Sequence, residues 1–285
     1  MRVQVGDVRL FFDLDGAALQ PDGPWMRRRP TILLLHPGPG FDHALYKVFL
    51  GPSLARFGQV VYLDQRAQGR SDGSPAERLT LETWADDVRG FCDALEIRRP
   101  IVLGHGFGAM VAAAYGARHP EHPRRLVLVN GAARVVPARS VAAYERLGGP
   151  AAGEAAKMLF EQPNERTFAV FMRHAFPQTT TEATAEIAAR ATWNPDALIH
   201  WRRYATANVD LRGALGAVRA PTLVLAGEDD PELTPAGSEE LVQSLPPGVG
   251  QLRTYPGARH GLFRDSPAAF EDLLAFIRDL GEEDE

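Results

Sequence analysis

Short apolar segments alternate with helical patterns along most of this 285-residue chain, and this alternation constrains the fold more than any other feature. Continuous apolar runs at 31–36 and 59–66 predict strands that are buried on both faces. Between 81 and 95 the apolar residues recur at helical spacing, with Thr80 as the predicted N-cap. Because neighbouring parallel strands need a crossover helix, the alternation predicts an α/β fold with a doubly wound, mostly parallel sheet.

The alternation stops after Gly131 and resumes at PTLVLAGEDDP, residues 221–231. Residues 132–210 have helical patterns rich in alanine and aromatic residues, without a clear strand. We therefore expect a core formed by residues 1–131 and 211–285, with an inserted helical cap formed by residues 132–210. Such a cap would cover the carboxyl ends of the strands, where an open α/β sheet binds its ligand.

Composition and charge narrow the expected partners. The formal net charge is −5, which gives no indication of nucleic acid or an anionic membrane as a partner. The single cysteine, Cys92, excludes an internal disulfide. The sequence shows no signal-peptide pattern and no run of about 18 apolar residues, so a cytoplasmic protein is expected. No His, Asp, Glu and Cys cluster has metal-ligand spacing, so we expect no metal. We also expect no other cofactor, a small-molecule substrate, and a monomer or homodimer.

The segment IVLGHGFGAM, residues 101–110, joins an apolar strand to a helix through a glycine-rich turn. It matches the dinucleotide-binding pattern G-x-G-x-x-G/A, but that pattern expects an acidic residue about 20 positions on. Here the next strand ends in Asn130, and the turn follows two earlier sheet strands rather than opening the first βαβ unit. The alternative is a nucleophile elbow, G-x-S-x-G, in which Gly106 stands at the serine position.

Four further motifs occur at distant positions along the chain: HPGPG at 36–40, DQRAQGRSDG at 64–73, GEDDP at 227–231 and GARHG at 257–261. Together with the elbow, they resemble the α/β-hydrolase fold and, within it, the proline iminopeptidase-like branch, whose signature is HGGPG. This resemblance implies hydrolysis of an ester, amide, lactone or peptide bond by a nucleophile, an acid and a histidine in that order along the chain.

The resemblance implies a role for each matching residue. The histidine is His260, and the acid that orients it is Asp230, with the adjacent Asp229 as the alternative. The oxyanion hole needs two backbone N–H groups, and one is expected from Phe107 at the start of the helix. Since Pro37 has no N–H, the other donor is expected from Gly38.

Gly106 is the departure from the family pattern. The elbow residue normally has a positive φ, which glycine adopts freely, but glycine lacks the hydroxyl. His105 is expected to point away from the site. Three hypotheses stay open: an inactivated serine hydrolase; an enzyme that uses His260 and Asp230 for direct hydrolysis, elimination, isomerisation or cyclisation; and a non-catalytic binding protein with a capped pocket.

The substrate pocket is less defined by the sequence. Candidate lining residues are His36, Phe171, Trp193 and Trp201, although His36 also fits a structural histidine that bonds to loop backbone. In aminopeptidases of this resemblance, cap glutamates bind the free amino terminus of the substrate. Glu154, Glu161 and Glu165 are the candidates here, and surface charge is the simpler interpretation of each.

Overall fold

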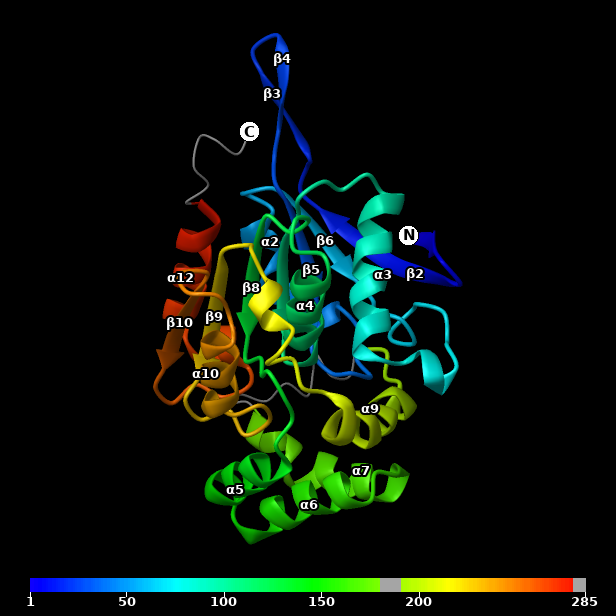
Figure 1. The fold of residues 1–285 in the computed structure, drawn as a ribbon, viewed down its shortest axis with the longest axis vertical. Coiled ribbons are helices and arrows are strands. Elements are labelled where there is room, and N and C mark those ends of the chain that lie inside the picture. The colour runs from blue at the N-terminus through cyan, green and yellow to red at the C-terminus, as the bar shows by residue number, and fades with distance from the viewer. Residues whose placement is uncertain (180–190, 279–285) are drawn as a thin grey trace.

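The centre of the molecule is an eight-stranded sheet, seen in a computed structural model that describes residues 1–179 and 191–278 (Figure 1). In spatial order its strands are β1 (Arg2–Val5), β2 (Val8–Asp15), β6 (Gln59–Leu63), β5 (Thr31–Leu35), β7 (Ile101–His105), β8 (Arg125–Val129), β9 (Thr222–Gly227) and β10 (Gly250–Tyr255). The pairs β1–β2 and β2–β6 are antiparallel, and all other pairs are parallel. The predicted mostly parallel, doubly wound sheet is confirmed.

Both faces of the sheet are covered, which explains the continuous apolar runs. In β5, Leu33 and Leu35 pack into one apolar cluster, whereas Ile32 and Leu34 pack into the other on the opposite face. The first face is covered by α3 (Leu81–Ala94), α4 (Phe107–Arg118) and α10 (Pro235–Gln243). The second is covered by α1 (Ala44–Phe49), α2 (Gly51–Leu54), α11 (Leu262–Asp265) and α12 (Pro267–Arg278).

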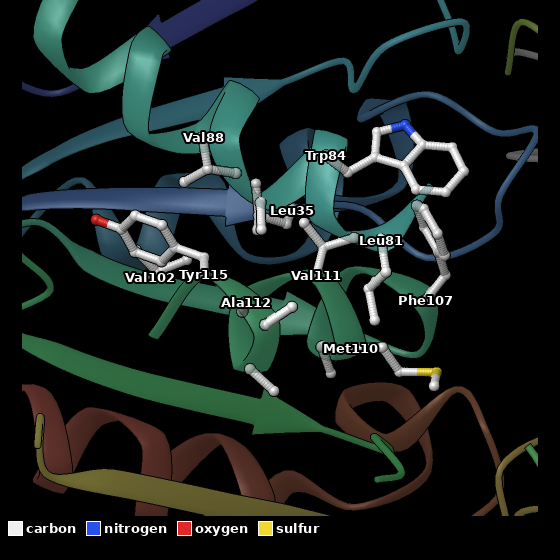
Figure 2. Packing of buried hydrophobic residues seen from close by; sticks show 14 of the residues in the cluster. Leu35, Leu81, Trp84, Val88, Val102, Phe107, Met110, Val111, Ala112 and Tyr115 are labelled. Atoms are coloured by element: carbon white, nitrogen blue, oxygen red, sulfur yellow. The ribbon is translucent and has the colours of Figure 1, made fainter. Parts of the chain in front are cut away.

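Helices α3 and α4 pack closely over the centre of the sheet, as Figure 2 shows. Thr80 caps α3 as predicted, because its side chain accepts a hydrogen bond from the backbone N–H of Thr83. Helix α4 lies very near β5, since a Cβ on Gly108 would be 2.2 Å from the carbonyl oxygen of Leu35. This close approach places the β7–α4 turn beside the loop that follows β5.

Between β8 and β9, the residues that the structure describes form the helices α5 (Pro137–Gly148), α6 (Pro150–Glu161), α7 (Glu165–His174) and α9 (Pro195–Asn208). They gather at one end of the molecule (Figure 1). Residues 192–194 connect them to the loop after β5, because the N–H of Asn194 donates to the oxygen of Gly40 and the N–H of Thr192 donates to Asp42. Short 3-10 turns occur in the described part of the chain at Ala76–Arg78, Phe176–Thr179 and Leu215–Ala217.

The sequence patterns did not predict a second, two-stranded sheet formed by β3 (Leu19–Asp22) and β4 (Trp25–Arg28). All eight residues of these strands are exposed, so neither face imposes an apolar alternation on the sequence. The hairpin projects from the end of the molecule opposite the four inserted helices (Figure 1). Within residues 1–179 and 191–278, no helix is long and apolar enough to cross a membrane.

Candidate active site

The turn between β7 and α4 places Gly106 at the amino end of α4. Its φ of 55° and ψ of −116° form a conformation that residues with a Cβ rarely adopt. The N–H of Gly106 donates to the carbonyl oxygen of Val129, which ties the turn to the end of the neighbouring strand β8. Gly106 therefore lies at the carboxyl edge of the parallel sheet, beside the free N–H groups at the start of a helix.

His260 faces this turn from the loop that follows β10. A Cβ built on Gly106 would lie 2.7 Å from His260 Nε2 and 3.0 Å from Cε1. This separation is below normal van der Waals contact, so the imidazole occupies the space that a side chain at position 106 would need. A dinucleotide pyrophosphate would need the same space above the turn, which argues against the dinucleotide interpretation.

Of the two adjacent aspartates, Asp230 is the one that contacts His260. Asp230 is 2% exposed, and its Oδ2 lies 2.8 Å from His260 Nδ1. Its other oxygen accepts a hydrogen bond from the backbone N–H of Glu232. Asp229 instead forms a salt bridge with Arg146 at the surface.

The charges around His260 favour its protonated form. Burial opposes the imidazolium, but the Asp230 carboxylate, its hydrogen bond and the charge of Glu232 together raise the pKa of His260. Glu232 itself is held as a carboxylate: burial opposes its charge, while Arg202, His260 and the hydroxyl of Tyr144 lower its pKa.

The backbone N–H groups of Gly38 and Phe107, near the turn, have no acceptor among the described residues. Phe107 is the first residue of α4, and Gly38 lies in the loop after β5 with φ of +138°. Pro37 of the same loop approaches the turn, since its Cβ would lie 3.7 Å from a Cβ on Gly106. Donors beside a helix amino end suit an oxygen that gains negative charge.

A mainly apolar cavity of about 120 Å³ opens beside His260. Phe41, Phe171, Phe176 and Trp193 supply its aromatic walls, and Trp193 packs against Phe41 with ring centroids 4.0 Å apart. The charged groups at the wall are Arg202, Glu232 and Asp42, in addition to His260. The cavity suits a small, largely apolar molecule with a polar group directed at His260.

Two of the candidate pocket residues lie outside this lining. Trp201 packs edge-on against Trp84 and Phe107 in the core beneath the turn, because its position on α9 faces the sheet. His36 is fully buried, with Nδ1 2.8 Å from the oxygen of Pro37 and Nε2 accepting from the N–H of Gln65. The expectation that they line the pocket was wrong, whereas Phe171 and Trp193 do line it.

The sequence patterns also missed residues that the structure brings to the site. His105 was expected to point away, but its Nε2 lies 2.6 Å from the carbonyl oxygen of His260 and it lines the cavity. Glu232 follows the GEDDP motif directly, yet no pattern distinguished it from a surface glutamate. Arg202 lies on α9, where its helical spacing gave no signal for a buried charge.

The comparisons with known proteins agree on the family. A family model described as alpha/beta hydrolase fold matches residues 30–267. Monoacylglycerol lipase from Mycolicibacterium smegmatis (strain ATCC 700084 / mc(2)155) is 28% identical over 293 residues, covering 96% of this chain and 94% of the lipase.

Two solved structures share the fold of this chain. A proline iminopeptidase-related protein from Thermus thermophilus matches with a TM-score of 0.75 and 25% identity, covering 97% of this chain and 95% of that one. The enol-lactonase from Burkholderia xenovorans LB400 matches with a TM-score of 0.74 and 21% identity, covering 98% and 100% of the two chains. With the family model spanning most of its length, this chain belongs to the alpha/beta hydrolase fold family.

Proposed function

We propose that this protein hydrolyses an ester, amide, lactone or peptide bond of a small, mainly apolar substrate without forming an acyl-enzyme. In this proposal Gly106 stands where relatives of this fold carry a nucleophilic serine, and His260 activates water instead. The observation that carries the proposal is the position of His260 Nε2, 2.7 Å from where a Cβ of residue 106 would lie, with Asp230 bonded to the opposite ring nitrogen.

The steps follow from this geometry. His260 Nε2 takes a proton from a water molecule, and the water oxygen attacks the substrate carbonyl carbon. The carbonyl oxygen becomes an oxyanion, which the N–H groups of Gly38 and Phe107 stabilise. When the tetrahedral intermediate collapses, Nε2–H gives the proton to the leaving oxygen or nitrogen. Asp230 stabilises the imidazolium between these two transfers.

The cavity supports the substrate class in this proposal. Its walls are mainly aromatic and aliphatic, with Phe41, Phe171 and Trp193 forming the apolar part and a charged group, Glu232, lying near His260. The match to a proline iminopeptidase-related protein makes prolyl amides one class to include, and the match to a monoacylglycerol lipase adds acyl esters.

The rate should be low. Loss of a triad nucleophile costs on the order of 10⁶ in turnover, while binding and the oxyanion hole retain roughly 10³ to 10⁴ over water. A serine-independent enzyme on this site should therefore turn over slowly and should show no burst of the leaving group.

The test is a side-by-side screen of the natural protein and Gly106→Ser on p-nitrophenyl esters, lactones and proline p-nitroanilide, with His260→Ala as the matched control. The proposal expects slow turnover by the natural protein without a burst, abolished in His260→Ala. Turnover that is indifferent to His260→Ala would rule out the dyad. A silent natural protein with an active Gly106→Ser would identify an inactivated serine hydrolase, and silence in both would favour a binding protein.

A further inference from the structure

Asn130 has an unusual backbone conformation at the carboxyl end of β8. Its φ is +47°, although it has a side chain and is only 1% exposed. A positive φ is uncommon for residues other than glycine, although asparagine adopts it more readily than most, and it costs on the order of 1–3 kcal/mol. The roles of His260, Asp230 and the Gly106 turn give no reason for this strain.

The side-chain amide of Asn130 connects three segments. Its Oδ1 accepts from the N–H of Gly227 at the end of β9, 2.8 Å away. Its Nδ2 donates to the carbonyl oxygens of Arg259 and His260, at 3.0 and 2.9 Å. The amide is therefore directed at the two loops that carry Asp230 and His260.

His105 supplies a second donor to the same carbonyl. Its Nε2 lies 2.6 Å from the oxygen of His260, and since a carbonyl only accepts, Nε2 carries the hydrogen. Burial, and then the charge of His260, lower the pKa of His105 to about 3, so the ring stays neutral in this tautomer. Its Nδ1 is buried and has no hydrogen-bond partner among the described residues.

His260 needs such support because residues 257–261 form neither a helix nor a strand. The bond to Asp230 holds only the ring, while the direction of Nε2 depends on the backbone that carries the ring. Catalytic geometry must be held to within about 0.5 Å, and this is usually done by a surrounding shell of hydrogen bonds. Two donors on one carbonyl fix that backbone to the carboxyl ends of β8 and β7.

We propose that Asn130 and His105 are positioning residues that hold the His260 carbonyl and thereby direct Nε2 at the Gly106 turn. This inference rests on the proposed function only for the role of His260 as the acid–base residue. The positioning of the His260 ring by Asn130 and His105 does not depend on that role.

Two variants remove one donor each. Asn130→Gly deletes the amide at a φ that glycine adopts freely, so the backbone is not strained by the change. His105→Phe keeps a ring of similar size without a donor, and His105→Gln restores an N–H donor as a rescue. Asn208→Ala is the control, because Asn208 is exposed on α9 and its amide donates to the carbonyl oxygen of Tyr204, one turn earlier in the same helix.

The first measurement is the pKa of His260, obtained from an NMR titration of ¹⁵N-histidine-labelled protein. The charged groups that face its ring are Asp230, Glu232 and Arg202, and His105 adds a neutral ring. We expect the pKa to fall towards about 6.5 in Asn130→Gly and His105→Phe, as the contact with Asp230 loosens. His105→Gln should return it towards the natural value, and Asn208→Ala should leave it unchanged.

The second measurement is kinetic and uses the Gly106→Ser background. Asn130→Gly and His105→Phe should each lower kcat by about 10- to 100-fold while changing KM little, as is usual when a group that orients a catalytic side chain is lost. Folded variants that retain both the natural pKa of His260 and the parental kcat would overturn the proposal. The proposed function fails separately, if the protein with Gly106 shows no turnover that depends on His260, and the titration still decides the positioning. If Asn130→Gly fails to fold, His105→Phe decides it.

Discussion

The Gly106 turn predicts a specific stability cost for any side chain at position 106. Gly106→Ala introduces a Cβ at φ of 55° and ψ of −116°, where the backbone strain for a residue with a side chain is on the order of 1–3 kcal/mol. The new Cβ would also lie 2.7 Å from His260 Nε2, so the imidazole must shift to relieve the contact. The opposing effect, a smaller conformational entropy of the unfolded chain, stabilises by about 0.4–1 kcal/mol.

Strain therefore outweighs the entropy gain, and the free energy of unfolding should fall by about 1–2 kcal/mol. For a chain of this size, that corresponds to a decrease in Tm of roughly 2–8 °C, measured by calorimetry or circular dichroism. Gly213→Ala is the matched control, because a Cβ there meets nothing within 4 Å and its φ is not in the strained range. A Gly106→Ala protein as stable as the natural one would refute the reasoning that this turn is tuned to glycine.

Three further predictions follow from the site. Folding raises the pKa of His260, so protonated His260 adds to the free energy of unfolding, in full below about pH 6.5. This contribution is lost as pH rises through the folded pKa. Asp230→Asn should remove this decrease when unfolding is measured at increasing pH. Folding lowers the pKa of His105 to about 3, so the free energy of unfolding should decrease as pH drops below about 6.5. The decrease is at most about 1.4 kcal/mol per pH unit. It should be smaller in His105→Phe. Trp193→Ala removes an aromatic wall of the cavity and should raise KM for p-nitrophenyl butyrate about tenfold in the Gly106→Ser background, whereas Trp25→Ala, at an exposed position of β4, should not.

The sheet was predictable because its signals are local. Leu33 and Ile32 face opposite apolar layers, so the whole of β5 had to be apolar, and the run was visible without any knowledge of its neighbours. The β3–β4 hairpin was not predictable for the converse reason, since Trp25 and the other residues of both strands are exposed and no buried face imposes a pattern.

The site was only partly predictable. The motif order brought Asp230 and His260 into the same hypothesis, and the choice between Asp229 and Asp230 needed the direction of each side chain in the turn. The orientation of His105 depends on a carbonyl 155 residues further along the chain, which no local pattern reports. Trp193 and Trp201 lie close together in the sequence, and only the packing of Trp201 on Trp84 separates a core residue from a pocket residue.

The central claim is that His260 and Asp230 form an acid–base pair aimed at the turn that carries Gly106. The most direct test is intact-mass spectrometry after treatment with a fluorophosphonate, which reacts with an activated serine. The account predicts one covalent adduct on Gly106→Ser, none on the natural protein, and none on the double variant that also carries His260→Ala. A folded Gly106→Ser protein that remains unlabelled, or labelling that persists without His260, would contradict it.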